Sequence, residues 1–363
     1  MTDTLFTIQE HNEYNGYDKL YPKTHASLIV NPPQATGARI DVTCLPASSG
    51  IVVNLSGQKT ASATTNSNGK CSFEGLDYGE YTVSATIGGS EKSETVTIDA
   101  SKIYDVELGI RASATLNDND WATISSISSA GLASSYWNVG DTKTIILNGQ
   151  VGNTTFSNLS IDAYILGINH NAEVEGNNRI HFCIGKVNNN TVGLVDSQYE
   201  QYPMTSSGYF SMSYGDSNTN SGGWNGCYMR STIMSAIKDA LPTDLQNVLK
   251  TVTKYTDNTG GSDSSSNVTA TIETICLEAE FEVQGARSFA NSYEQNKQKQ
   301  YDYYKNGNSK IRYKYNDTNS AVWWWNRSPI SDDFISFCCV DTGGMTSYDV
   351  SRSSRAVAPC FYV

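Results

Sequence analysis

Charge and histidine are scarce in this sequence. Charged residues make up 17% of its 363 residues, and its histidines are His11, His25, His170 and His181. Asp and Glu (37) outnumber Lys and Arg (25), which gives a formal net charge of −12. Because nucleic-acid affinity depends largely on neutralising phosphates with Lys and Arg, this balance argues against a nucleic-acid partner. The abundant Gly, Ser, Thr, Asn and Tyr favour a β-rich, loop-rich binding protein.

Long apolar runs are also absent. No segment is apolar over enough residues to cross a bilayer, so we expect no membrane partner. The N-terminus lacks a basic leader followed by an apolar core, so we expect no signal peptide and synthesis in a bacterial cytoplasm. The eight cysteines are scattered without a CxxC pair. That distribution is more typical of small buried thiols than of a metal site or a disulfide framework.

Few residues are grouped in a way that suggests catalysis or metal binding. His170 and His181 can face one another across a hairpin and bind a metal, or they can be hydrogen-bonded structural or surface side chains. Glu278, Glu280 and Glu282 alternate, which on a strand would place them on one face. We expect that face to be solvated, with a metal or acid/base role as the alternative.

The stretch "DNTGGSDSSSN" (257–267) is dense in the hard oxygen ligands that calcium prefers. Its spacing does not match an EF-hand loop, so a structural calcium ion stays open. No stretch combines the glycines, the lysine and the strand-to-helix setting of a phosphate loop. We therefore predict that the protein is not an enzyme and needs no cofactor.

Changes of pattern divide the chain into three regions. Residues 1–36 are polar and weakly periodic, which suggests an extended arm. Residues 37–111 contain short alternating apolar runs separated by Gly, Ser and Asn turns, which predicts a small all-β sandwich. Part of this region resembles prealbumin-like or carboxypeptidase-regulatory-like modules, through Gly69, Phe73, Leu76, Gly79, Tyr81 and Val83.

Residues 112–363 mix helical and strand patterns, which predicts an α+β domain. Apolar residues at helical spacing predict two helices within 227–252, broken at Pro242. We expect a strand over 143–147 and another within 270–283, followed by a helix over 288–307 that ends at Gly307.

An ordered series of stretches in this third region resembles a domain of unknown function that is common in prophages of gut bacteria and has the C-type lectin fold. The stretches are "YWNVGDTKTIILNG" (136–149), "GGWNGCYMR" (222–230), "TVTKYTDNTGG" (251–261), "FANSYEQNKQKQYDYYKNGNSKIRYKYN" (289–316) and "WWNRSP" (324–329). In many members the final segment, here residues 323–363, is the variable region of a diversity-generating retroelement. Related phage tropism determinants bind host receptors at tail-fibre tips.

In such a retroelement, adenines of a template are mutated, so Asn codons yield many residue types but never Lys, Glu, Gln or Trp. Residues 330–355 contain none of these four types, whereas Met345 departs from the scheme. The resemblance implies an unvaried set, here called the frame: Trp324, Trp325, Arg327, Ser328, Pro329, Phe337, Cys338, Val340, Gly344, Val357, Ala358, Pro359, Phe361 and Val363. It implies ligand contact at the variable positions: Asn326, Ile330, Asp332, Asp333, Ile335, Ser336, Cys339, Asp341, Gly343, Thr346, Ser347, Tyr348, Asp349, Arg352 and Arg355.

The resemblance implies a hypervariable adhesin of a phage virion that binds a protein or glycan receptor on a bacterial surface. It also implies a homotrimer, whose multiple sites would add avidity. Residues 20–30 resemble the starts of phage tail and baseplate proteins, so residues 1–36 are expected to attach to the virion. Two alternatives stay open. One is an oxidoreductase similar to the formylglycine-generating enzymes, using Cys338, Cys339 and Cys360, and the other is a purely structural tail protein.

Overall fold

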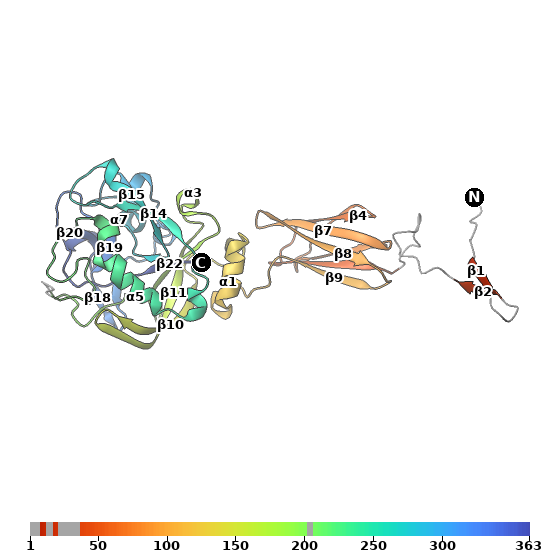
Figure 1. Ribbon diagram of the computed structural model, residues 1–363, viewed down its shortest axis with the longest axis horizontal. Coiled ribbons are helices and arrows are strands. Elements are labelled where there is room, and N and C mark those ends of the chain that lie inside the picture. The colour runs from red at the N-terminus through yellow and green to blue at the C-terminus, as the bar shows by residue number, and fades with distance from the viewer. Residues whose placement is uncertain (1–7, 12–16, 21–36, 202–205) are drawn as a thin grey trace. The chain divides into compact units, whose positions relative to one another are not determined.

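The computed structural model describes residues 8–11, 17–20, 37–201 and 206–363. They belong to two compact units, Met1–Arg111 and Ala112–Val363 (Figure 1). The expected arm and virion attachment at residues 1–36 lie outside the described residues, except for a hairpin of β1 (Ile8–His11) and β2 (Tyr17–Leu20). No helix within the described ranges is long and apolar enough to cross a membrane.

In the first unit, residues 37–111 form two sheets, with strand orders β6-β3-β9 and β5-β4-β7-β8. Alternation builds them: Ile40, Val42 and Cys44 are buried while their neighbours on β3 are more exposed, as expected for strands with one face on a core. The strands are β3 (Arg39–Cys44), β4 (Val52–Gly57), β5 (Ala61–Thr64), β6 (Lys70–Glu74), β7 (Gly79–Ile87), β8 (Ser90–Ile98) and β9 (Ile103–Leu108).

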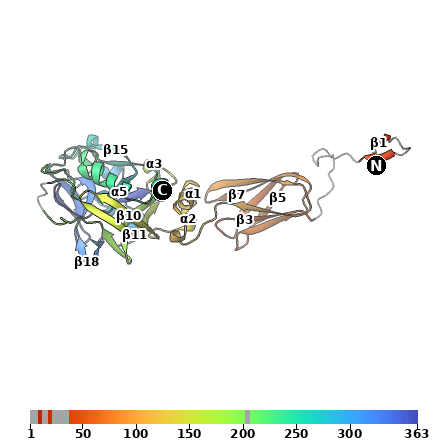
Figure 2. The same ribbon diagram turned by 60° about the horizontal axis from the view of Figure 1, so that its bottom comes forward.

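The second unit contains one large sheet and two small ones. In the large sheet the order is β10-β11-β12-β13-β17-β18, and β22 pairs with both β12 and β16. Its two longest strands, β10 (Thr142–Val151) and β11 (Thr154–Ile168), form a hairpin and run side by side in Figure 2. The other strands are β12 (Ile180–Val187), β13 (Asn190–Gly193), β16 (Ile275–Cys276), β17 (Arg312–Lys314), β18 (Asp317–Val322) and β22 (Cys360–Tyr362). The small sheets pair β14 (Val252–Asp257) with β15 (Val268–Glu273), and order β19 (Trp324–Pro329), β20 (Ser336–Val340) and β21 (Thr346–Val350) consecutively.

Helices are short, and the predicted α+β class with a C-type lectin-like domain is wrong. The protein is mostly β: about 40% of its residues form strands, which belong to several sheets, and 17% form helices. The longest α-helix of the described residues is α1 (Trp121–Ser129). The others are α2 (Ala133–Tyr136), α3 (Ala172–Glu175), α4 (Gly223–Gly226), α5 (Ser235–Asp239), α6 (Thr243–Gln246), α7 (Glu280–Gln284) and α8 (Asp302–Lys305), with a π-helical turn over Met229–Met234.

The predicted helix over 288–307 is one cause of this error. Apart from a 3₁₀ turn (Glu294–Asn296) and α8, the segment is irregular. Its polar side chains point inward and form hydrogen bonds with β14: Asn291 donates to Asp257 Oδ2 at 2.7 Å, and Glu294 accepts from the Asp257 amide at 2.8 Å. A buried backbone can leave regular structure when side chains supply its hydrogen-bond partners.

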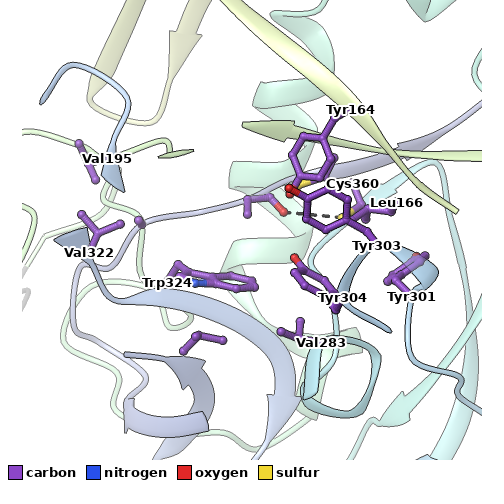
Figure 3. Close-up of a cluster of buried hydrophobic side chains, with 14 of the residues drawn as sticks. Tyr164, Leu166, Val195, Val283, Tyr301, Tyr303, Tyr304, Val322, Trp324 and Cys360 are labelled. Atoms are coloured by element: carbon purple, nitrogen blue, oxygen red, sulfur yellow. Dashed lines mark hydrogen bonds between the residues drawn. The ribbon is translucent and has the colours of Figure 1, made fainter. Parts of the chain in front are cut away.

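An aromatic core joins the large sheet to the C-terminal strands. Figure 3 shows Trp324 in one cluster with Tyr164, Tyr303 and Tyr304, and all four side chains are buried. Arg312 partners two of the hydroxyls: its guanidinium donates to Tyr164 Oη at 2.9 Å and to Tyr304 Oη at 3.2 Å, and it lies 4.5 Å from the Trp324 ring. Buried hydroxyls normally require such partners. The cluster therefore fixes the start of β19 against the large sheet.

A second buried cluster consists of charges. Lys254 on β14 donates to Glu175 at 2.6 Å and to Glu282 at 2.8 Å. Arg327 on β19 binds both oxygens of Glu282, at 2.5 and 2.9 Å, and its Nε donates to Thr256 at 2.8 Å. Burial would raise the pKa of Glu282, but the Arg327 and Lys254 charges outweigh it and hold that pKa well below its usual range.

The three alternating glutamates are therefore not on a solvated strand face, contrary to the prediction. Glu278 follows β16, and Glu280 and Glu282 belong to α7; all three are buried. Each has its own partners: Glu278 pairs with Arg312 at 3.2 Å, Glu280 accepts the backbone amides of residues 288–290, and Glu282 holds Lys254 and Arg327. Alternation alone could not separate these roles, because each partner comes from a distant part of the chain.

Replacing Arg327 with Ala should destabilise the second unit by about 3–5 kcal/mol, because it removes one partner of a buried ion pair. All six tryptophans lie between residues 121 and 325, so tryptophan fluorescence during denaturation reports this unit alone. The matched control is Arg287→Ala, because Arg287 and Asp263 pair at 3.5 Å with side chains 30% and 40% exposed. Its loss should stay below about 1 kcal/mol. Equal losses for the two variants would contradict a structural role for the Arg327 cluster.

Candidate functional site

The frame at the start of the C-terminal segment is entirely buried. Every residue of β19 is buried, and its two tryptophans each donate to a backbone carbonyl, Trp324 to Lys310 at 3.1 Å and Trp325 to Phe210 at 3.0 Å. Arg327 enters the charged cluster described above. Ser328 donates to Glu294 at 2.7 Å. These side chains belong to the core and are not available as binding platforms.

Strands β20 and β21 differ in exposure although they are paired. All of β20 is buried because it lies between β19 and β21, whereas β21 is the outer strand of this sheet and is partly exposed. The register places Tyr348 opposite Cys338 and Thr346 opposite Val340. Side chains on β21 therefore meet solvent on one side and a buried strand on the other.

The loop between β19 and β20 is held mainly through backbone atoms. The Asn220 side chain is buried, and its amide donates to the carbonyls of Ile330, Asp333 and Ser336 at 3.2, 3.0 and 3.0 Å. The Asn220 backbone amide also donates to the Phe334 carbonyl at 2.9 Å. Because these acceptors are carbonyls, the contacts with Asn220 do not depend on which side chains the loop carries.

Two predicted contact residues stabilise turns. Asp333 Oδ1 accepts from the amides of Ile335 and Ser336 at 2.9 and 2.7 Å. Asp341 Oδ1 accepts from the amides of Gly343 and Met345 at 2.8 and 2.9 Å. Such Asx turns are a common use of aspartate in tight loops. One oxygen of each carboxylate is thus engaged within the chain.

The variable positions fall into three groups by exposure. Asp332, Ile335, Gly343 and Tyr348 are exposed. Partly buried positions are Asp333, Asp341, Thr346, Ser347, Asp349, Arg352 and Arg355. The prediction of direct ligand contact is wrong for the fully buried group, which is Asn326, Ile330, Ser336 and Cys339.

Position within the sheet explains the buried group. Asn326 lies inside β19, and Ile330 packs with Ala290 and Cys338. Ser336 and Cys339 belong to the central strand β20. Variation at these four positions would alter packing beneath the surface, whereas contact with a ligand needs solvent access.

Several partly buried positions are already paired. Arg355 and Asp349 form an ion pair at 2.6 Å, and the Arg355 guanidinium lies 5.5 Å from the Trp323 ring. Thr346 donates to the buried Glu280 at 2.5 Å. These contacts couple the outer strand to the core, so the more exposed positions are the best contact candidates.

Two exposed residues were missed by sequence reasoning. Phe334 is 72% exposed and Met345 is 65% exposed, among the largest apolar exposures of the described residues. The Phe334 ring lies against Gly261, where an added Cβ would come within 2.4 Å of it, so this contact requires glycine. The Phe289 ring meets the ring of the exposed Tyr348 edge-on, with ring centroids 4.9 Å apart. The sequence did hold a signal for Phe334, because a large apolar residue that follows two aspartates in a turn has few places to be buried.

The expected histidine pair does form, inside the protein. The rings of His170 and His181 lie 5.5 Å apart and are buried. Burial lowers the pKa of His170 to about 3, so the ring is neutral. Near them, His170, Glu175 and Glu282 have metal-ligand geometry, but the Lys254 ammonium already bridges the two carboxylates. A protein cation thus occupies the place that a metal ion would take.

The proposed calcium loop uses its oxygens in hydrogen bonds. Asp257 Oδ1 accepts from the amides of Thr259 and Gly260 at 2.9 and 2.8 Å. Asp263 accepts from the Ser292 amide at 2.6 Å and pairs with Arg287. Among the residues described, the ligand clusters found lie elsewhere, around His170 and around Cys183.

The cysteines of the enzymatic alternative do not meet. Cys338 and Cys339 are consecutive on β20, so they point to opposite faces, and Cys360 lies on β22 in another sheet. Burial raises the pKa of all three thiols, which disfavours the reactive thiolate. Cys360 instead pairs across strands with Cys183, beside Glu278.

Comparisons with known proteins are sparse. A family model described as a domain of unknown function (DUF6273) matches residues 189–363. No curated protein matches the chain. A crystal structure of a DUF3823 family protein from Parabacteroides merdae ATCC 43184 matches with 12% sequence identity and a TM-score of 0.18, over 43% of this chain and 59% of that one. The chain therefore spans less than two thirds of that protein, and neither description names a ligand or an activity.

The burial of Glu294 predicts that stability depends on pH. Burial raises the pKa of Glu294 from 4.5 to about 7, although the Asp257 amide and the Ser328 hydroxyl lower it. The folded state therefore keeps a proton that the unfolded chain releases, so this contribution to stability is complete below pH 4.5 and is lost as the pH rises through about 7. In Glu294→Gln, the free energy of unfolding should fall less than in wild type across that window. The control is Glu173→Gln, an exposed carboxylate on α3, whose pH profile should match wild type. A Glu294→Gln profile parallel to wild type would contradict the assignment.

Proposed function

We propose that this protein is a ligand-binding protein diversified by a retroelement, and that it acts as a receptor-binding adhesin of a phage or prophage. The observation that carries the proposal is how the segment 330–355 is anchored. Its loop is held at backbone carbonyls by Asn220, beside a fully buried frame. A site built in this way tolerates many side chains at Asp332, Ile335 and Tyr348 without losing its fold.

The composition of the exposed surface also supports binding. Asp332, Ile335 and Tyr348 combine charge, apolar area and an aromatic ring, and the exposed ring of Phe334 lies between Asp332 and Ile335 in the same loop. Small polar residues mixed with aromatic anchors are typical of binding loops that must recognise many ligands. Exposed apolar groups that cluster on a surface commonly mark an interaction site.

The expected setting is a virion tail, with a protein or glycan on the bacterial surface as the receptor. A trimer, which the family resemblance implies, would raise weak single-site affinity by avidity, by roughly 10²- to 10⁴-fold where the geometry allows. Light scattering of the purified chain measures this directly, and a monomer would count against the trimer.

The first test is a surface swap. The triple variant Asp332→Ala, Ile335→Ser, Tyr348→Ser should lose binding to intact cells of the host bacterium by at least about tenfold, since central contact residues often contribute more than 1.4 kcal/mol each. Its unfolding should stay close to wild type because these side chains are exposed. The matched control is Ile146→Ser, Ile272→Ser, which changes exposed apolar residues on β10 and β15. Cell binding that survives the triple variant would favour a structural tail protein.

The second test is genomic. The DNA near this gene should hold a near-copy of the codons for residues 323–363, with adenines at the variable positions and a reverse transcriptase gene beside it. The exposed positions Asp332, Ile335 and Tyr348 should all correspond to Asn codons in that copy. A locus without such a repeat would remove the diversification proposal and leave ligand binding to be judged by the surface swap.

A further inference from the structure

Beside the variable surface lies a hollow of about 240 Å³ formed by residues that are not among the variable positions. We propose that this hollow binds one uncharged sugar ring, as an unvarying subsite of the ligand-binding face. The inference rests on the proposed function and adds a ligand class to it. The lining of the hollow includes Ser213, Tyr214, Thr219, Ser221, Tyr228 and Phe337.

The chemistry of the lining selects a neutral, hydroxyl-rich ligand. Seven of the lining side chains carry a hydroxyl, and none is Asp, Glu, Lys, Arg or His. An ionised ligand that entered the hollow would lose its hydration without gaining a countercharge, and this desolvation costs free energy. Hydroxyls both donate and accept, so they match the hydroxyls of a sugar, which do the same.

Two tyrosines supply an apolar surface for the ring. Tyr214 is 62% exposed although it is large, and its ring meets the Tyr228 ring edge-on at 5.3 Å. A tyrosine combines an apolar face with a polar tip, which suits a pyranose, whose C–H groups stack on the face while its hydroxyls reach polar groups. The volume lies below the roughly 300–1,000 Å³ of pockets for drug-sized molecules, so one ring fits better than a larger ligand.

The hydroxyls are held in place before any ligand arrives. Tyr228 Oη accepts from the Gly208 amide at 3.0 Å, and Thr219 Oγ1 accepts from the Ser221 amide at 3.0 Å. Each therefore keeps its own proton for donation to a ligand. Ser213 donates to the Thr219 carbonyl at 3.0 Å and is bound to Ser351. Preorganised polar groups lower the entropic cost of binding.

The hollow is continuous with the variable segment. Phe337, a frame residue on β20, forms part of its wall, and Ser351 links Ser213 to the loop through its amide, which donates to the Ile335 carbonyl at 2.7 Å. A glycan with one ring in the hollow would place its next ring toward Ile335. The hollow would then bind a sugar ring that all the glycans have in common, and the variable residues near Ile335 would bind the rings in which the glycans differ.

The test titrates the full chain with glucose, galactose, mannose and N-acetylglucosamine, followed by saturation-transfer NMR. At least one should bind, and glucuronate should bind at least tenfold more weakly. Tyr214→Ala should weaken the bound sugar tenfold or more, and Ser221→Leu, which fills the hollow from an exposed position, should do the same. Tyr293→Ala, which removes an exposed tyrosine elsewhere, should bind as wild type.

The outcomes separate this inference from the proposed function. No binding by any of the four sugars, or binding that Tyr214→Ala and Ser221→Leu leave unchanged, overturns the sugar subsite. In that case, loss of cell binding in the Asp332, Ile335, Tyr348 triple variant would still uphold the adhesin. Conversely, sugar binding that depends on Tyr214, together with cell binding that survives the triple variant, would uphold the subsite and reject the variable face.

Discussion

The salt bridge between Arg327 and Glu282 is the interaction on which the second unit depends. Its charges are fully buried, and Lys254 and Glu175 extend it, so that β14, β19, α3 and α7 converge on it. A buried charge without its partner is costly, which means that these elements are stable together and unfavourable apart. The cluster therefore specifies how the frame strand β19 enters the core.

Buried polar side chains also hold the irregular, loop-rich parts of this unit together. Few of its helices exceed one turn. Buried polar side chains bind the backbone instead: Asn220 donates to a loop carbonyl, and Glu280 and Glu294 accept from backbone amides. Each of these contacts is made to main-chain atoms, which are the same for nearly every residue type. Sequence change at the surface is then separated from stability, and a diversified binding site needs this separation. The residues that line the hydroxyl-rich hollow are likewise not among the predicted variable positions.

The prediction from sequence was good where local patterns decide structure and poor where distant contacts do. The alternating runs near Ile40, Val53 and Tyr81 became strands because alternation matches the pleat. The helix predicted over 288–307 did not form, because Asn291, Glu294 and Gln298 turn inward to partners from distant segments. At the candidate site, Tyr348 and Asp332 are exposed as the predicted contacts require, whereas Asn326 and Cys339 are buried by strand positions that a codon pattern cannot reveal.

Composition and alternation sufficed to indicate a chain that is rich in strands and loops and low in charge. The absence of Lys, Glu, Gln and Trp from residues 330–355 was likewise readable from the letters. Burial was not readable, because it depends on which segments meet: Glu282 reads as a surface carboxylate until Arg327 and Lys254 reach it from other strands. The division of the C-terminal segment into core and surface has the same origin, since β20 is covered on both sides and β21 on one.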